Sequence, residues 1–289
     1  MQDITDYIRV NTIKEALKAL QTSSKPTHVL AGGTDLLLKL NGAEGDHPTL
    51  IDISNVGELN GIQKIENGLR IGATTKLKDI VQSDLLKKYV PIIPQSAVKV
   101  GSVQIRNLAT IGGNICNASP SADTATPLIV MDSIVELISL KGSRLIPLAK
   151  FFVGPGKTVL GEDEILTAIH IPKQPPGANS IYLKHTTRGA MDLAIVGVAV
   201  QIALIDGCHD VRIGLGAVAP TPMRSRKAEI FLSQVSKIGD KEINEAAHIA
   251  EQESKPISDI RASAKYRRDM VRVLTERALR KVLIDLIQS

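Results

Sequence analysis

The 289-residue sequence predicts an α+β protein of two domains. Three observations favour this class. Segments with helical and with strand-like periodicity are mixed through the first 172 residues, a break rich in proline and glycine follows at 173–179, and strand-like segments then give way to helix. A chain of this length that is 43% hydrophobic and 22% charged can bury a sizeable core.

The first 172 residues contain signals for helices, strands and two hairpins. Thr12 and Glu15 match a capping box at the start of a helix. Asn67-Gly68 is the strongest two-residue turn signal, and a second hairpin is expected about Lys141-Gly142-Ser143. The expected elements are a helix at 12–22, a strand at 29–31, a short helix at 36–40, a strand at 49–53, a hairpin at 62–72, a helical stretch at 76–89, a hairpin at 134–148 and a strand at 165–171. Residues 96–107 leave helix and strand open.

The second part predicts strands first and helices afterwards. Residues 180–219 are expected to form a three-stranded antiparallel meander, with Asp206-Gly207 as one of its turns. One face of the final helix is marked by apolar residues at helical spacing, namely Val271, Leu274, Ala278 and Val282. Basic residues near that helix predict a solvated or partner-facing surface, namely Arg261, Lys265, Arg267, Arg268 and Arg272.

Two Gly-Gly segments are the strongest candidates for a ligand site. Gly32-Gly33-Thr34-Asp35 and Thr110-Ile111-Gly112-Gly113-Asn114 each combine glycines with a hydroxyl and a following apolar segment. Glycine lets a phosphate approach backbone N–H groups, and a helix behind the turn adds further donors. Each pair could also be no more than a tight turn, but two pairs in similar surroundings favour a phosphate site.

Other motifs are explained better as structural features than as ligand-binding or catalytic sites. Gly214–Ala219 matches the dinucleotide pattern G-x-G-x-x-A, yet Pro220 and Pro222 follow where a helix is required. Gly154–Thr158 resembles the end of a P-loop but is interpreted as a turn. His28 and His185 are expected to be structural or surface residues rather than catalytic ones, and Lys184 is expected on base rates to be a solvated strand lysine.

Composition excludes several classes. A net charge of +5 could suggest nucleic acid, but Trp is absent and aromatic residues make up 2%, so stacking platforms are scarce. No apolar run approaches the length of a membrane span, and the acidic N-terminus lacks a signal-peptide core. Two cysteines are too few for an iron–sulfur cluster, and a cytoplasmic location is the default expectation.

Seven landmarks, in their order and spacing, resemble those of the FAD-binding medium subunits of the molybdenum hydroxylases. This family includes the flavin subunit of carbon monoxide dehydrogenase and the flavin domain of xanthine dehydrogenase. The landmarks span the chain and are Ala31–Leu36, Val100–Asn107, Ala109–Asn114, Ala118–Asp123, Glu164–Leu166, Arg188–Ala194 and Gly216–Pro222. The resemblance implies a two-part FAD-binding domain of the vanillyl-alcohol-oxidase type at 1–175, divided near 55–60, and a smaller α/β C-terminal domain with an antiparallel sheet and helices at 179–289.

The resemblance also implies which residues contact FAD. The two Gly-Gly segments would wrap the pyrophosphate, Asp123 would lie near the ribityl or diphosphate region, and Leu166 and Lys184 would contact the flavin. Leu193 would lie on the segment beside the isoalloxazine ring, and Val100 would occupy a stacking position where some relatives carry an aromatic. The full implied set is Val29, Leu30, Ala31, Gly32, Gly33, Thr34, Asp35, Leu36, Val100, Thr110, Ile111, Gly112, Gly113, Asn114, Asp123, Leu166, Lys184 and Leu193.

The function implied is that of an electron-transfer subunit. The chain would hold FAD non-covalently, accept electrons from [2Fe-2S] clusters of a small partner subunit and deliver them to NAD, a quinone or another acceptor. The molybdenum cofactor would lie on a large partner subunit, and the whole could form a dimer of heterotrimers. The alternative is a self-contained FAD oxidoreductase of the same flavin-domain superfamily, and a non-catalytic binding module is the remaining class.

Overall fold

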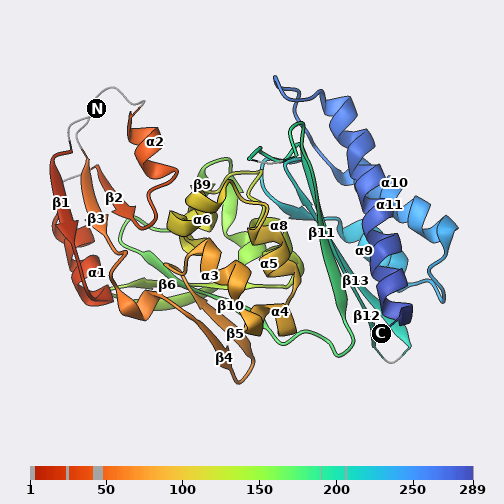
Figure 1. Ribbon diagram of the computed structural model, residues 1–289, viewed down its shortest axis with the longest axis horizontal. Coiled ribbons are helices and arrows are strands. Elements are labelled where there is room, and N and C mark those ends of the chain that lie inside the picture. The colour runs from red at the N-terminus through yellow and green to blue at the C-terminus, as the bar shows by residue number, and fades with distance from the viewer. Residues whose placement is uncertain (1–3, 24–25, 42–47, 190, 206, 289) are drawn as a thin grey trace.

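The computed structural model describes residues 4–23, 26–41, 48–189, 191–205 and 207–288. Its three larger sheets define an N-terminal, a central and a C-terminal lobe (Figure 1). A cluster of buried apolar side chains lies within each lobe. Parallel and antiparallel strands in separate sheets, with helices packed on them, give the α+β class that the sequence predicts.

The N-terminal lobe is a parallel sheet in the order β1-β3-β2. Its elements are β1 (Asp6–Arg9), α1 (Ile13–Thr22), β2 (Thr27–Leu30), α2 (Leu36–Asn41) and β3 (Thr49–Asp52). The hydroxyl of Thr12 accepts a hydrogen bond from Glu15 N at 3.1 Å and caps α1. The Glu15 carboxylate accepts from Asn11 N at 2.9 Å, so the second half of the predicted capping box is made one residue earlier than the pattern requires.

The central lobe is an antiparallel sheet in the order β4-β5-β10-β6-β7. Its strands are β4 (Ile62–Ile65), β5 (Gly68–Gly72), β6 (Ile134–Ser139), β7 (Gly142–Pro147) and β10 (Ile165–Pro172). Its helices are α3 (Leu77–Gln82), α4 (Asp84–Tyr89), α5 (Ile92–Ala97), α6 (Val103–Leu108), α7 (Ile111–Cys116) and α8 (Ala125–Val130). The shorter elements are η1 (Gly57–Leu59), η2 (Leu148–Lys150), β8 (Phe152–Gly154) and β9 (Lys157–Thr158). Residues 96–107, which the sequence left open, belong to α5, α6 and the loop between them.

Both predicted hairpins form, but each turn lies one residue earlier than expected. Ile65 pairs with Gly68, so Glu66-Asn67 is the loop. In the other hairpin Ser139 pairs with Gly142. Each glycine opens its second strand with a φ of about +140°, a conformation that disfavours other residues.

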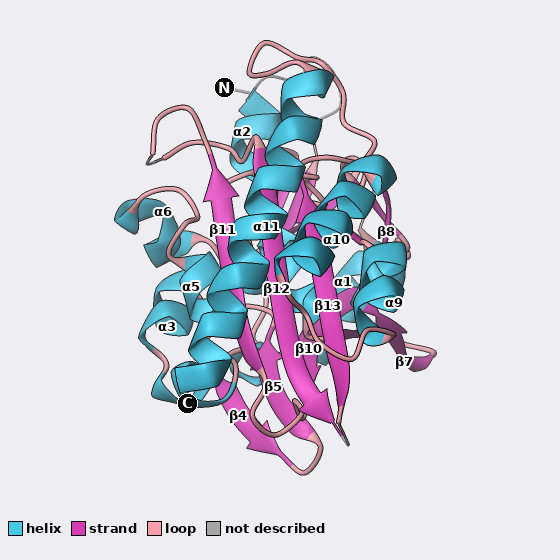
Figure 2. Ribbon diagram, turned by 90° about the vertical axis from the view of Figure 1, so that its right-hand side faces the viewer, coloured by secondary structure: helices cyan, strands magenta, loops and turns pink. Residues whose placement is uncertain are grey.

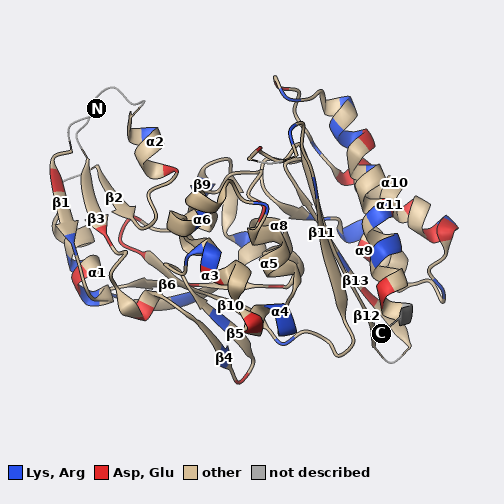
Figure 3. Cartoon of the chain, in the orientation of Figure 1, with Lys and Arg blue, Asp and Glu red and all other residues tan. Residues whose placement is uncertain are grey.

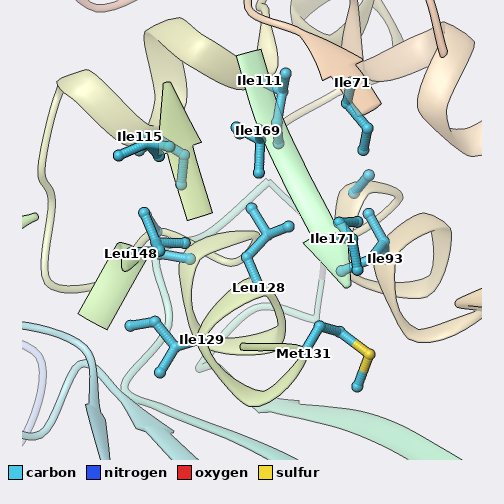
Figure 4. Close-up of a cluster of buried hydrophobic side chains, with 14 of the residues drawn as sticks. Ile71, Ile93, Ile111, Ile115, Leu128, Ile129, Met131, Leu148, Ile169 and Ile171 are labelled. Atoms are coloured by element: carbon cyan, nitrogen blue, oxygen red, sulfur yellow. The ribbon is translucent and has the colours of Figure 1, made fainter. Parts of the chain in front are cut away.

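The largest core lies between the central sheet and its helices. Figure 4 shows Ile169 and Ile171 of β10 grouped with Ile111, Leu128 and Ile93 from three helices. All five side chains are at most 1% exposed. Burying each such side chain stabilises the fold by about 1.5–3 kcal/mol, so this core fixes α7 and α8 against the sheet.

The C-terminal lobe contains the predicted three-stranded antiparallel meander, and a short fourth strand beyond residue 219 joins it. The strands are β11 (Asn179–His185), β12 (Val196–Ile205), β13 (Cys208–Gly216) and the short β14 (Met223–Arg224). The helices are α9 (Arg226–Ser233), α10 (Asp240–Glu253) and α11 (Ala264–Gln288), and Figure 2 shows α10 and α11 in front of the sheet. The predicted buried face of the last helix is confirmed, since its four apolar residues are at most 5% exposed. Asp206 of the predicted turn lies outside the described residues.

The inner face of this sheet packs against α8 of the central lobe. A Cβ on Gly214 would lie 2.7 Å from Val130 Cγ2, and a Cβ on Gly216 would lie 2.4 Å from Thr126 Oγ1. The glycines of the G-x-G-x-x-A match therefore let a helix approach a strand closely. This confirms that the match is not a dinucleotide fingerprint.

The basic C-terminal surface needs one correction. Figure 3 shows basic and acidic positions interspersed along the ribbons of α10 and α11. Arg267, however, is 4% exposed; its guanidinium donates to Ile195 O at 2.8 Å and pairs with Asp259 at 2.9 Å. It ties α11 to the strand segment beneath it instead of facing solvent or a partner. No helix in the described ranges has both the length and the apolar composition needed to cross a membrane.

Candidate functional site

A pocket of about 370 Å³ opens between the N-terminal and central lobes. One wall is the segment that follows β2, and the opposite wall comes from α6 and the start of α7. Residues 160–166, which lead into β10, form a third wall. Both Gly-Gly segments border this pocket, so the structure brings together two motifs that lie about 80 residues apart.

The first Gly-Gly segment leaves its backbone donors free. Within the described part of the chain, the N–H groups of Gly32, Gly33, Thr34 and Asp35 donate to no protein atom. The N–H groups of Leu37 and Lys39 that follow donate to Gly33 O and Asp35 O, each at 3.1 Å. Four neighbouring unpaired donors on a pocket wall are suited to the oxygens of a phosphate, which needs several donors close together.

Two different constraints explain the glycines of this loop. Gly33 has a φ of +71°, which favours glycine over residues with a Cβ. Gly32 has an ordinary φ, but a Cβ there would lie 2.2 Å from the carbonyl oxygen of Leu108. The loop therefore lies directly against the end of α6, which belongs to the opposite wall of the pocket.

The second Gly-Gly segment is not a turn, which corrects the sequence prediction. Thr110 is the N-cap of α7, and Gly112 and Gly113 lie in its first turn. Their donors are used within the protein: Gly112 N donates to Ala73 O at 2.9 Å and Gly113 N to Thr110 Oγ1 at 3.2 Å. The capping hydroxyl makes a helix more favourable than a turn here, because it satisfies an N–H group that the first helical turn leaves unpaired.

Packing explains the glycine at position 112. A Cβ on Gly112 would lie 2.7 Å from both the Cβ and the carbonyl oxygen of Ala73. The start of α7 is thereby pressed against the residue that follows β5. Gly113 has more room, because a Cβ there would meet only the hydroxyl oxygen of Thr110, at 2.9 Å.

An arginine fixes the third wall. Arg144 of β7 binds Glu164 through two parallel bonds of 2.6 and 2.7 Å, and Glu164 also accepts from Gly161 N at 2.7 Å. Hydrogen bonding from Arg144 holds the pKa of Glu164 below its usual value. The carboxylate stays ionised and shapes the wall; it is not free to act as a proton donor.

The surroundings of Cys116 and His28 shift the pKa values of both side chains away from their reactive or charged forms. Burial raises the pKa of the Cys116 thiol to about 12. Burial, together with the charge of Lys39, lowers the pKa of His28. Cys116 is therefore a protonated thiol and His28 a neutral imidazole at pH 7, and neither is set up for covalent chemistry.

Most of the residues that the resemblance implied line this pocket. They are Val29, Ala31, Gly32, Gly33, Thr34, Asp35, Leu36, Val100, Thr110, Gly112, Gly113, Asn114 and Leu166. Five others do not line it, namely Leu30, Ile111, Asp123, Lys184 and Leu193. Ile111 is fully buried in the core beneath the pocket.

Asp123 and Lys184 instead form a buried pair between two lobes. Lys184 Nζ lies 2.8 Å from Asp123 Oδ2, and Tyr182 Oη donates to Asp123 Oδ1 at 2.8 Å. Both charged side chains are less than 10% exposed, so the expectation of a solvated lysine is wrong. Burial raises the pKa of Asp123, while Lys184 acts in the opposite direction. Lys184 also donates to Lys99 O at 3.0 Å, next to Val100 at the pocket.

Leu193 lies on the loop between β11 and β12. Its side chain is 49% exposed, and the neighbouring Met191 is 71% exposed. Arg188 interacts with Asp192 on the same loop, whereas Ala190 lies outside the described residues. The segment expected beside the isoalloxazine ring thus presents apolar side chains to the surface.

Several pocket residues escaped the sequence reasoning. They are polar or apolar neighbours of the predicted segments, among them His28, Lys39, Ile105, Cys116 and Glu164. The helix start at the first Gly-Gly segment indicates Lys39, which lies four residues after Asp35 on α2. Asn117 also lines the pocket, at the end of α7.

The comparisons with known proteins agree with this geometry. Residues 2–174 match the family described as the FAD binding domain in molybdopterin dehydrogenase, and residues 181–282 match the CO dehydrogenase flavoprotein C-terminal domain. The chain belongs to this family of FAD-binding subunits. The resemblance found in the sequence, the fold class and the assignment to flavoprotein oxidoreductase subunits are thereby confirmed.

Individual relatives cover almost the whole chain. The xanthine dehydrogenase FAD-binding subunit of Escherichia coli O157:H7 is 35% identical over 282 residues, covering 96% of each protein. The carbon monoxide dehydrogenase medium chain of Afipia carboxidovorans is 32% identical over 280 residues, also covering 96% of each. The solved structure of carbon monoxide dehydrogenase from Hydrogenophaga pseudoflava superimposes with a TM-score of 0.93 at 29% identity, covering 98% of this chain and 99% of the other.

The pocket fits the cofactor of this family. The free N–H groups of Gly32 to Asp35 are suited to a diphosphate, and Gly32 and Gly33 place no Cβ atom on their part of that wall. Apolar side chains of Val100, Ile105 and Leu166 line other parts of the pocket, where an aromatic ring can be buried. The donor set and the apolar surface together match the two chemical halves of a flavin dinucleotide.

Proposed function

We propose that this chain is the electron-transfer subunit of a molybdenum hydroxylase complex. It would accept electrons from [2Fe-2S] clusters of a small partner subunit and deliver them to NAD, a quinone or another acceptor. The observation that carries the proposal is the row of unpaired N–H groups at Gly32 to Asp35, on the wall of a pocket in a chain of the FAD-binding subunit family. FAD, when bound, supplies the redox chemistry, and the protein binds and orients it.

The contacts that we propose with FAD are made by residues that line the pocket. Gly32 to Asp35 would donate to the diphosphate, and Val100, Leu166 and the start of α7 would enclose the rest of the cofactor. Lys184 and Asp123 would act at one remove, because their pair holds the carbonyl of Lys99 beside Val100. Leu193 and its loop are proposed to lie against the flavin or a partner in the assembled complex.

The domain limits are also a proposal. Residues 1–175 would form the FAD-binding domain and residues 179–289 the C-terminal domain. The two family matches end and begin at 174 and 181, which supports a boundary in the segment between β10 and β11. A subdivision near 55–60 is supported by η1, which lies between the first and second sheets.

The complex would include a large subunit with the molybdenum cofactor and a small subunit with the clusters. The relatives are named as subunits or medium chains, which supports a multi-subunit assembly. A dimer of heterotrimers and a cytoplasmic location stay predictions. Native mass measurement of the purified complex would test the first, and cell fractionation the second.

Anaerobic absorbance of the flavin tests the relay. The isolated chain should bind FAD but leave it oxidised when a substrate of the complex is added, because the substrate site would lie on another subunit. Addition of the large and small subunits should then bleach the flavin band. Bleaching by the chain alone would contradict the relay and favour the self-contained oxidoreductase.

Acid precipitation tests the mode of attachment. We expect all of the flavin to remain in the supernatant, because the Cys116 thiol is protonated at neutral pH and His28 is partly buried and neutral. Cys116→Ser should release flavin to the same extent as the unmodified chain. A yellow precipitate would show a covalent bond.

A further inference from the structure

Lys39 reaches across the pocket from one lobe to the other. It lies in the last turn of α2 in the N-terminal lobe, and its ammonium donates to the side-chain oxygen of Asn117 at the end of α7 in the central lobe. The two residues are 78 positions apart, and both line the pocket. The contact therefore bridges the two walls that carry the Gly-Gly segments.

Lys39 forms no ion pair with a carboxylate among the described residues. Among the described residues that line the pocket, it is the one Lys or Arg, while Asp35, Glu162 and Glu164 are acidic. Glu164 is already paired with Arg144. The partner of Lys39 is a neutral amide oxygen, which is a weaker acceptor for an ammonium than an ionised oxygen.

The backbone N–H groups of the pocket do not neutralise the negative charge of a diphosphate, whereas a positive side chain can. The N–H groups of Gly32 to Asp35 are neutral donors, and a diphosphate brings two negative charges to the same wall. Lys39 stands one helical turn beyond that loop, at the end of a long and rotatable side chain. Its field already extends into the pocket, since it helps to lower the pKa of His28.

We propose that Lys39 is the counter-charge for the diphosphate of the bound dinucleotide, and that Asn117 holds the ammonium at the pocket until the cofactor arrives. The inference rests on the proposed FAD site and extends it to a residue outside the glycine loop. On binding, the Nζ–H bond to the Asn117 oxygen is exchanged for a bond to a phosphate oxygen, which is stronger because both groups are charged.

Binding of FAD and of riboflavin by the flavin-free chain tests this role. Riboflavin carries the ring and ribityl chain without phosphate. Lys39→Met should weaken FAD binding by about tenfold or more and leave riboflavin binding within about twofold, as expected for loss of one charge-assisted hydrogen bond. Lys39→Arg should keep most of the FAD affinity. Lys14→Met, which removes an exposed lysine from α1, is the matched control and should change neither.

Salt and the partner amide separate a counter-charge from a structural latch. The FAD dissociation constant should rise less steeply with salt in Lys39→Met than in the unmodified chain, because one screened charge pair is gone. Asn117→Ala should weaken FAD binding less than Lys39→Met does, because the ammonium is kept and only the contact that positions it before binding is lost. Equal losses for FAD and riboflavin in Lys39→Met, or a loss in Asn117→Ala as large as in Lys39→Met, would overturn the counter-charge. An unmodified chain that binds no FAD would overturn the proposed function itself.

Discussion

The two Gly-Gly segments share a dipeptide and a pocket but use their glycines differently. At Gly32-Gly33 the backbone is a loop with one left-handed residue, and its N–H groups are free. At Gly112-Gly113 the backbone is helical, and its N–H groups are satisfied by Thr110 and Ala73. The first pair provides donors for a ligand, whereas the second pair lets a helix start close to its neighbour. Identical residues therefore give binding in one place and packing in the other.

The largest expected effect is on folding, at the second segment. In Gly112→Ala the new Cβ would collide with the backbone of Ala73, which cannot rotate away. We expect the free energy of unfolding of the flavin-free chain to fall by about 3 kcal/mol, as in an overpacked core. Urea denaturation followed by circular dichroism measures this loss.

The matched control is Gly154→Ala, where a Cβ would meet open space and φ is not positive. It should leave stability within about 0.5 kcal/mol, because the new methyl group would meet no neighbouring atom. Equal stability of Gly112→Ala and Gly154→Ala would show that the start of α7 can move away from Ala73, and the packing role of the second pair would be wrong.

The next effect is on binding, at the first segment. Gly33→Ala forces a side chain into a left-handed conformation, at a cost of about 1–2 kcal/mol. The loop can relieve this strain by turning its peptide groups, which moves the free donors away from the pocket. FAD affinity should fall by about tenfold, equivalent to about 1.4 kcal/mol, as measured by flavin fluorescence titration.

Gly207→Ala provides the control for this backbone strain. Gly207 has a φ of +79°, lies in the β12–β13 turn and has open space around its Cβ position. Gly207→Ala is expected to lose as much stability as Gly33→Ala but to bind FAD with unchanged affinity. If Gly207→Ala weakened FAD as much as Gly33→Ala, general destabilisation rather than loss of donors would be the cause.

The smallest effect distinguishes a cap from a ligand contact. Thr110→Val removes the hydroxyl that accepts from Gly113 N and leaves that N–H free at the pocket. We expect a loss of about 1 kcal/mol in unfolding free energy, typical of an N-cap, and an FAD affinity within about twofold of the unmodified chain.

Ser102→Ala, which removes the corresponding cap of α6, should lower the free energy of unfolding by a similar amount. A much larger loss of FAD affinity in Thr110→Val would indicate that the hydroxyl itself contacts the cofactor.

Local patterns predicted the regular elements well because their causes are local. The spacing of Val271, Leu274, Ala278 and Val282 records which face of α11 is buried. Errors arose where a distant segment decides the outcome. At position 68, at the start of β5, a Cβ would lie 2.0 Å from Ile171 O, so the position requires glycine. Ile171 lies about 100 residues further along the chain, so the sequence of the hairpin does not reveal this contact.

The sequence by itself determined the α+β class, most element positions, the family and the two segments that border the pocket. Hydrophobic period and turn residues are properties of neighbouring residues, and the landmarks are recognised by their order along the chain, so none of them requires a contact between distant residues. Only the tertiary structure decided which donors are free, that Lys184 is paired with Asp123, and that Lys39 faces Asn117 across the pocket. Both of these pairs join residues more than 60 positions apart, and the free energy of such contacts is set by burial and geometry that no local pattern contains.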